Sequence, residues 1–212
     1  MFTGDVQEQF QDLEQQTHAA ELGMWVFLAS EVLFFSGLFG LFAAYRFEYG
    51  DLFREAARHT DLALGTANTF ILLTSSLLVA LCVHGIGAGW RIRSVQMLLA
   101  GTATLGLLFL GLKLLEYVHH FREGIYPGAY YAYAELPDRG ARVFFTLYYA
   151  MTGIHAVHVA IGIALMIWML LLTRNQRLDA AYHTPLELAG IYWHFVDIVW
   201  VFLWPMFYLM RG

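Results

Sequence analysis

Residues 143–172 read VFFTLYYAMTGIHAVHVAIGIALMIWMLLL and contain no Asp, Glu, Lys or Arg. A bilayer core is about 30 Å thick, and a helix of about 20 mainly apolar residues crosses it. A strand of a membrane barrel needs only about 10 residues and alternates polar with apolar positions, which this stretch does not. The stretch therefore predicts a membrane-spanning α-helix.

The composition of the whole chain agrees with a membrane protein. Of its 212 residues, 59% are hydrophobic and 14% are charged, whereas soluble domains are about 45–50% apolar and about 25% charged. A net charge of −5 leaves no basic surface for a nucleic acid. The single cysteine, Cys82, excludes a disulfide framework.

Four further stretches are long and apolar enough to cross a bilayer. The expected spans are 22–44, 66–86, 95–118, 143–172 and 186–210. Residues 1–20 carry acidic residues but no Lys or Arg, which is unlike a signal peptide and predicts an acidic N-terminal arm. With no linker-like segment, the sequence predicts one domain over residues 1–212, an all-α integral membrane protein with five transmembrane helices.

The segments between the spans are expected to be loops, including Tyr45–Gly65 and a Tyr-rich loop within 119–142. Tyr and Trp favour the membrane–water interface. The six tryptophans are therefore expected mostly at span ends or on lipid-facing sides.

Ionisable side chains at membrane depth are costly and need a partner or a purpose. Spacings of three or four residues place such side chains on one face of each of the last three helices. They are Lys113, Glu116, His155, His158, His194 and Asp197. The favoured interpretation is an interhelical hydrogen-bond network, since lipid gives helices no hydrophobic reason to associate.

A metal site is the alternative interpretation of the same residues. A di-metal bundle needs Glu-x-x-His on two helices, and here Glu116 with His119 gives it once at most. The sequence therefore predicts no metal and no catalytic residue in this chain.

Glu31 lies near the middle of the first expected span, and no cation occurs three or four residues away. A carboxyl in that setting is expected to be neutral, because burial disfavours its charged form. It is either an acid hydrogen-bonded to another helix or a proton-exchanging, carbodiimide-reactive group.

Several short motifs occur in an order that resembles a known family. They are SEVLFF at 30–35, ANTFILL at 67–73, EY at 116–117, TGIHAVHV at 152–159 and YWHFVDIVW at 192–200. Over residues 20–210 the chain resembles subunit III of the haem–copper terminal oxidases, in the bacterial five-helix form.

The resemblance implies an accessory subunit that binds no cofactor of its own, with haem and copper in partner subunits. Such a subunit docks on oxidase subunit I, in a complex with subunit II and other subunits, binds phospholipid and supports proton uptake. Glu31 occupies the place of the family's carbodiimide-reactive glutamate. Glu116, His155, His158, His194 and Asp197 match the family's interhelical polar core.

The chain also departs from the seven-helix mitochondrial form. It lacks the first two helices, and in some relatives extra helices fused to subunit I fill their place, which we expect here also. Lys113 is a second departure. A close alternative function is that of the related protein associated with nitric oxide reductase. More distant alternatives are a stand-alone membrane metalloenzyme and a proton transporter.

The orientation in the membrane has two conflicting indications. Raw counting of arginines in the loops favours an outside N-terminus by the positive-inside rule. The resemblance implies a bacterial inner-membrane protein with the N-terminus inside and the C-terminus outside, and this is the orientation that we expect.

Overall fold

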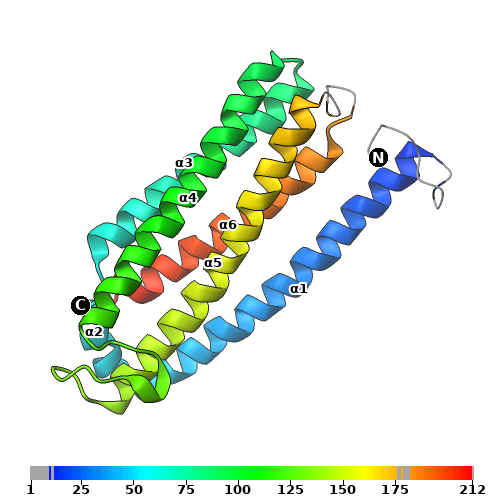
Figure 1. Ribbon diagram of the computed structural model, residues 1–212. Helices are drawn as coiled ribbons and strands as arrows, with labels where there is room; N and C mark the ends of the chain where they lie inside the picture. The colour runs from blue at the N-terminus through cyan, green and yellow to red at the C-terminus, as the bar shows by residue number, and fades with distance from the viewer. Residues whose placement is uncertain (1–9, 11, 176–177, 179–181, 212) are drawn as a thin grey trace.

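The computed structural model describes residues 10, 12–175, 178 and 182–211. These residues form helices and no strand (Figure 1). The helices are α1 (Leu13–Glu48), α2 (Gly50–Arg58), α3 (Leu62–Gly87), α4 (Ile92–Arg122), the short 3₁₀ helix η1 (Gly128–Tyr130), α5 (Arg139–Arg174) and α6 (Thr184–Tyr208). Helices α1, α3, α4, α5 and α6 are long and apolar enough to span a membrane. The prediction of five spans is therefore confirmed.

Helix α1 begins well before the expected span, at Leu13. The side chain of Asp12 accepts a hydrogen bond of 2.8 Å from the backbone N–H of Gln15, which caps the helix. The following Leu-Glu-Gln-Gln residues all favour a helix, although three of the four are polar. Residues 13–20, predicted to belong to an arm, are thus the first turns of α1, and most of residues 1–12 lie outside the described residues.

Helix α2 lies inside the segment that was predicted to be a loop, and that prediction is wrong. Its apolar face buries Phe53, Ala56 and Ala57 completely, while its polar face carries the ion pair of Arg54 with Asp51 at 2.7 Å. An amphipathic helix of nine residues is too short to span the membrane. It therefore closes one end of the bundle instead.

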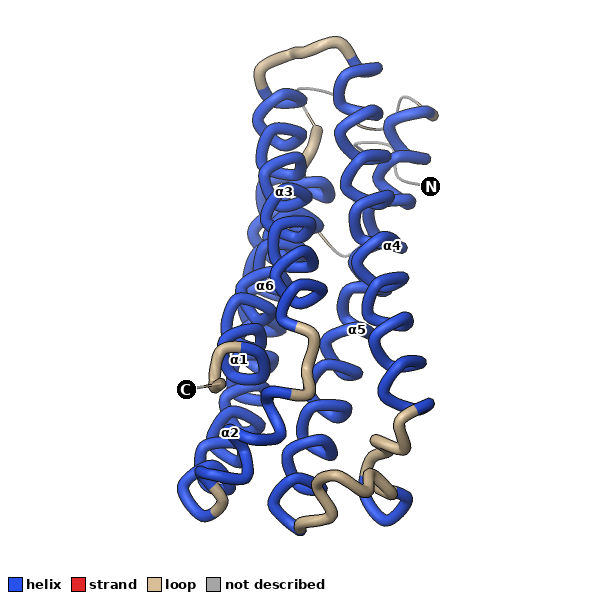
Figure 2. The backbone as a smooth tube through the Cα atoms, turned by 90° about the vertical axis from the view of Figure 1, so that its left-hand side faces the viewer, coloured by secondary structure: helices blue, strands red, loops and turns tan. Residues whose placement is uncertain are grey.

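Helices α3, α4, α5 and α6 pack as a group in which α3 contacts α4 and α6, and α5 contacts the same two helices. Helix α1 lies at the edge and contacts only α2, α5 and α6 among the helices (Figures 1 and 2). Small residues allow close approach within the group. A Cβ atom on Gly162 would lie 2.7 Å from the ring of Trp193, and one on Gly106 would lie 2.8 Å from it.

Trp193 and Trp200 are 1% and 0% exposed, so the prediction that the tryptophans lie mostly at span ends or lipid faces is wrong for these two. Both side chains point into the helix group and donate through their ring N–H, Trp193 to Ser75 at 3.1 Å and Trp200 to Thr69 at 3.0 Å. Hydrophobicity could not separate them from lipid-facing residues, because both faces of a membrane helix are apolar.

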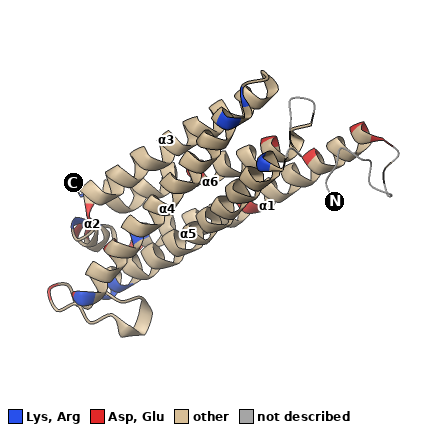
Figure 3. Cartoon of the chain, turned by 45° about the horizontal axis from the view of Figure 1, so that its top comes forward, with Lys and Arg blue, Asp and Glu red and all other residues tan. Residues whose placement is uncertain are grey.

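The outer surface of the helices is apolar, as at Leu33 and Phe70, which are 74% and 65% exposed. Charged residues are drawn mostly toward the two ends of the bundle (Figure 3). In a protein surrounded by lipid, the apolar belt between them is the surface in contact with acyl chains.

Candidate functional site

Lys113 and Glu116 of α4 form an ion pair of 3.0 Å with side chains only 3% and 1% exposed. The ammonium group of Lys113 also donates to the hydroxyls of Tyr148 and Tyr208, each at 2.8 Å. The Tyr208 hydroxyl donates to the Glu116 carboxylate at 2.8 Å. All three N–H bonds of the lysine are thus directed at a partner.

Aromatic rings surround the same ammonium group. Its nitrogen lies 4.6 Å from the ring centre of Tyr148, 5.2 Å from that of Tyr117, 5.4 Å from that of Trp200 and 5.5 Å from that of Tyr208. A cation is attracted to the face of such rings, more strongly where water is excluded. The cluster joins α4, α5 and α6, because its residues come from all three helices.

Glu31 has a partner on a different helix. Its Oε2 lies 3.1 Å from Nε2 of His158 on α5, and the side chains of His158 and Glu31 are 15% and 19% exposed. Nδ1 of His158 lies 2.9 Å from the main-chain oxygen of Ile154. A carbonyl can only accept, so Nδ1 carries a proton. One further proton then lies between Glu31 and Nε2, either on the acid or on the imidazole.

His194 of α6 bonds Ser76 of α3, with 2.6 Å between Nδ1 and Oγ. Asp197, one turn further along α6, is 3% exposed. Its carboxyl interacts with the same serine without hydrogen-bond geometry, and neither oxygen has a hydrogen-bond partner among the described residues.

His155 is fully buried. Its ring centre lies 5.6 Å from that of Phe109 and 5.2 Å from that of Trp200. Neither ring nitrogen has a hydrogen-bond partner among the residues that the structure describes.

The predicted polar residues therefore lie in separate places and not in one continuous network of hydrogen bonds. Lys113 bonds Glu116, His158 bonds Glu31, His194 bonds Ser76, and His155 packs against aromatic rings. Sequence reasoning did not identify Tyr208 or Ser76 as partners, since neither is ionised or conspicuous in an apolar helix. A Cβ atom on Gly65 would lie 2.6 Å from the ring of Tyr208, so this glycine marks where α3 leaves room for that tyrosine.

Outside the spans, the Tyr-rich loop is anchored by hydroxyl groups. The Tyr131 hydroxyl donates to the main-chain oxygen of Leu136 at 2.9 Å, and that of Tyr133 contacts Nδ1 of His59 at 3.1 Å. Burial raises the pKa of Tyr131 to about 12. The phenol of Tyr131 is thus neutral at physiological pH.

Metal ligands do not converge in the described part of the chain. No group of three or more His, Cys, Asp or Glu residues there is arranged to hold a metal ion. Glu31 and His194 instead each bond a side chain on another helix, and Lys113 bonds side chains of its own helix and of two others.

Comparison with known proteins gives a consistent result. A model of the family Cytochrome c oxidase subunit III matches residues 7–211. The chain is 33% identical over 192 residues to cytochrome c oxidase subunit 3 of Thermostichus vulcanus, which covers 89% of this chain and 86% of that protein. It is 31% identical over 189 residues to cytochrome c oxidase subunit 3 of Alkalihalophilus pseudofirmus, covering 89% and 85%.

A quinol oxidase subunit is similar to the same degree. The chain is 30% identical over 190 residues to quinol oxidase subunit 3 of Bacillus spizizenii, covering 89% of this chain and 86% of that protein. With its five apolar helices, the chain is a multi-pass protein of a bacterial membrane. The match to the family extends over almost the whole chain, so this chain belongs to the cytochrome c oxidase subunit III family, the subunits III of haem–copper oxidases.

Proposed function

We propose that this chain is an accessory subunit without a redox centre, which stabilises subunit I of a proton-pumping haem–copper oxidase, binds phospholipid and supports proton uptake. The observation that carries the proton-related part is the pair of Glu31 and His158, 3.1 Å apart. The pair holds one exchangeable proton between an acid and a base at membrane depth. Moving that proton from the acid to the imidazole separates two charges 3.1 Å apart but leaves the pair with no net charge.

The same pair supports the docking role through α1. This helix lies at the edge of the bundle, where large apolar side chains such as Val26 and Leu33 are 64% and 74% exposed. Lipid or another membrane subunit must cover such a surface. The pair ties α1 to α5, which fixes the angle at which α1 presents its outer face to subunit I or to helices fused to it.

The proposed orientation has the N-terminus inside and the C-terminus outside. An odd number of spans puts the two ends of the described chain on opposite sides, as they are drawn in Figure 1. The ends of α1 and α4 that contact the Tyr-rich loop and α2 then face the outside. Haem and copper belong to partner subunits in this proposal, with subunit II and other subunits in the same complex.

Replacement of Glu31 by Gln tests the proton role in the intact complex. Gln can still donate to Nε2 of His158, but it cannot hold the exchangeable proton. We expect normal assembly, no carbodiimide labelling at position 31, and proton uptake slowed by about twofold to tenfold. A catalytic acid–base group would account for a factor of about 100 or more.

Glu21→Gln is the matched control, because Glu21 lies on the same helix and is exposed. It should leave proton uptake unchanged. Normal uptake in the Glu31→Gln complex would remove the proton role, and loss of assembly would mean that Glu31 is a charged anchor. Copurification with nitric oxide reductase subunits instead of oxidase subunits would favour the related alternative function.

A further inference from the structure

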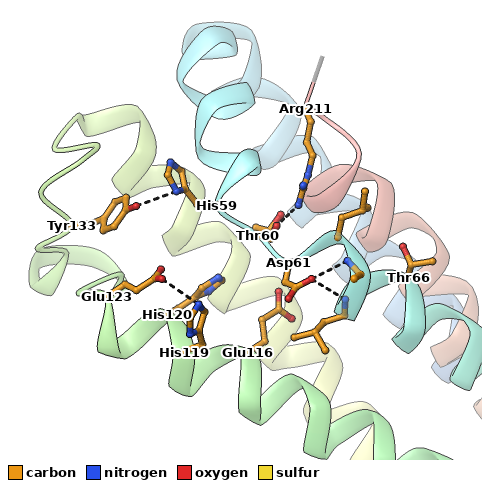
Figure 4. A pocket seen from close by; sticks show the side chains of 13 residues that line it. His59, Thr60, Asp61, Thr66, Glu116, His119, His120, Glu123, Tyr133 and Arg211 are labelled. Carbon is orange, nitrogen blue, oxygen red and sulfur yellow. Dashed lines mark hydrogen bonds and ion pairs between the residues drawn. The ribbon is translucent and has the colours of Figure 1, made fainter.

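An open cavity of about 1020 Å³ lies where the N-terminal end of α3 meets the C-terminal end of α4 and the segment after α6 (Figure 4). Its polar lining includes Asp61, Glu116, His119, His120, Glu123 and Arg211. Glu116 is shared with the buried lysine cluster, whereas the other five belong to none of the sites described above.

Hydrogen-bond acceptors outnumber donors in this lining. Asp61 and Glu123 bring two carboxylates besides Glu116, whose charge Lys113 already balances. Arg211 is the only Lys or Arg among the lining residues that the structure describes. The Arg211 guanidinium already donates to main-chain oxygens of Thr60 and Tyr208. Two of its five N–H donors are therefore turned toward the protein. Asp61 and Glu123 together exceed the charge of Arg211 by one negative charge.

A buried and unpartnered nitrogen points to a ligand. His120 is 1% exposed, and its Nδ1 has no hydrogen-bond partner among the described residues. The ring of His120 also lies near the main chain of His59, without hydrogen-bond geometry. In the tautomer that carries its proton on Nε2, Nδ1 offers a lone pair to a donor in the cavity.

We propose that this cavity binds a primary ammonium group. Such a group brings one positive charge and three N–H donors, which match a lone pair on His120 together with carboxylate oxygens. A metal ion fits less well, because no group of three or more His, Cys, Asp or Glu in the described residues is arranged to hold one. On the other side of Glu116, the ammonium of Lys113 is held by the same kind of acceptors at 2.8 to 3.0 Å.

Two sources can supply this ammonium group. The cavity opens at the ends of membrane helices and has Leu62 and Leu64 in its lining, which suits the headgroup of phosphatidylethanolamine. A free amine from the aqueous phase carries the same chemistry. If the ammonium group comes from phosphatidylethanolamine, the inference rests on the proposed lipid binding. In either case it is independent of the proposed docking on subunit I.

Zero-length cross-linking tests the inference in the intact complex, reconstituted in nanodiscs. A water-soluble carbodiimide activates a carboxyl group, a bound amine then attacks its carbonyl carbon, and an amide forms while the carbodiimide leaves as the urea. Glu123 is the reporter inside the cavity and Glu55 is the matched control outside it. Each has a basic side chain close by, His119 at 3.2 Å from Glu123 and Arg58 at 2.9 Å from Glu55, and the two glutamates are 38% and 46% exposed.

We expect amide formation with phosphatidylethanolamine at Glu123 to exceed that at Glu55 by about fivefold. This ratio corresponds to a difference of about 1 kcal/mol in binding free energy. A second arm uses nanodiscs of phosphatidylglycerol alone with free ethanolamine. Labelling of Glu123 in the first arm only assigns the site to the lipid, and labelling in both arms assigns it to ammonium groups in general.

Asp61→Asn removes one charge from the cavity but keeps the cap of α3, since Asn is an equally good N-cap. His120→Phe removes the lone pair and keeps a planar ring. Each should lower the preference for Glu123 over Glu55 by about threefold to fivefold, with the subunit composition of the complex unchanged. Equal labelling of Glu123 and Glu55 in both arms, or a preference unaffected by Asp61→Asn, would overturn the proposal.

Discussion

A lysine at membrane depth is tolerated here because its surroundings satisfy it completely. Lys113 has a carboxylate and two hydroxyl groups as hydrogen-bond partners, with four aromatic rings around them. A buried ion pair contributes little net stability, but removal of one partner leaves an uncompensated charge. The energetic consequence of a substitution therefore depends on whether the second charge remains.

Lys113→Met should destabilise the protein by about 3–5 kcal/mol, because Glu116 would keep a buried charge without its cation. The double variant Lys113→Met/Glu116→Gln should recover a large part of that loss, since Gln is neutral and can still bond Tyr208. Thermal unfolding of the complex in detergent measures both. A double variant less stable than Lys113→Met would contradict this account of the cluster.

The Tyr-rich loop should open as the pH rises. Burial raises the pKa of Tyr131 in the folded protein to about 12, compared with about 10 in an unfolded chain. Its contribution to stability is fully present below pH 10 and is lost between about pH 10 and pH 12. Limited proteolysis of the loop at increasing pH should show cleavage rising in that window.

Tyr131→Phe should remove most of this pH dependence, because Phe does not ionise. Tyr130→Phe is the control, as Tyr130 is 81% exposed and lies next to it in the chain. If both variants kept the wild-type pH dependence, another group would have to control the loop.

Sequence reasoning at the residue scale identified polar side chains but not their partners. The spacing of Lys113 and Glu116 predicts their contact, because residues three apart are neighbours on a helix. Glu31 and His158 are 127 positions apart in the sequence, and this separation does not predict their contact. Partners on different helices depend on how the helices pack, and spacing along one helix cannot reveal it.

At the scale of the elements, the five long helices follow from their apolar length, and α2 was missed because it is short and amphipathic. The contacts between helices depend instead on where small residues meet large ones. Gly106 of α4 and Gly162 of α5 both face the ring of Trp193 on α6. This one indole is therefore a junction of three helices.

Gly162→Ala should destabilise the bundle by about 1–3 kcal/mol, because its Cβ would overlap a buried ring 2.7 Å away. Gly153→Ala on the same helix meets no atom within 4 Å and should be neutral or stabilising by up to about 1 kcal/mol. Thermal unfolding of the two complexes compares them. If the two variants were equally stable, the Trp193 junction would have to be more adaptable than its packing indicates.

At the scale of the whole molecule, the apolar belt identifies a membrane protein but does not indicate which part of the surface contacts a partner subunit. Lipid-facing and partner-facing surfaces look alike in the sequence, because both are apolar. Among the polar side chains at depth, Glu31 and His194 bond side chains on other helices. His155 and Asp197 have no hydrogen-bond partner among the described residues. The family match shows a subunit III of a haem–copper oxidase.

The central claim is that this chain acts as an accessory subunit of a haem–copper oxidase. The most direct measurement is purification of the tagged chain from its native membrane in mild detergent, with identification of the copurified subunits and metal analysis of each. We predict copurification with subunit I and with subunit II, and haem and copper bound to those partners. Recovery of the chain without oxidase subunits, or with stoichiometric iron or copper bound to the chain itself, would contradict the account.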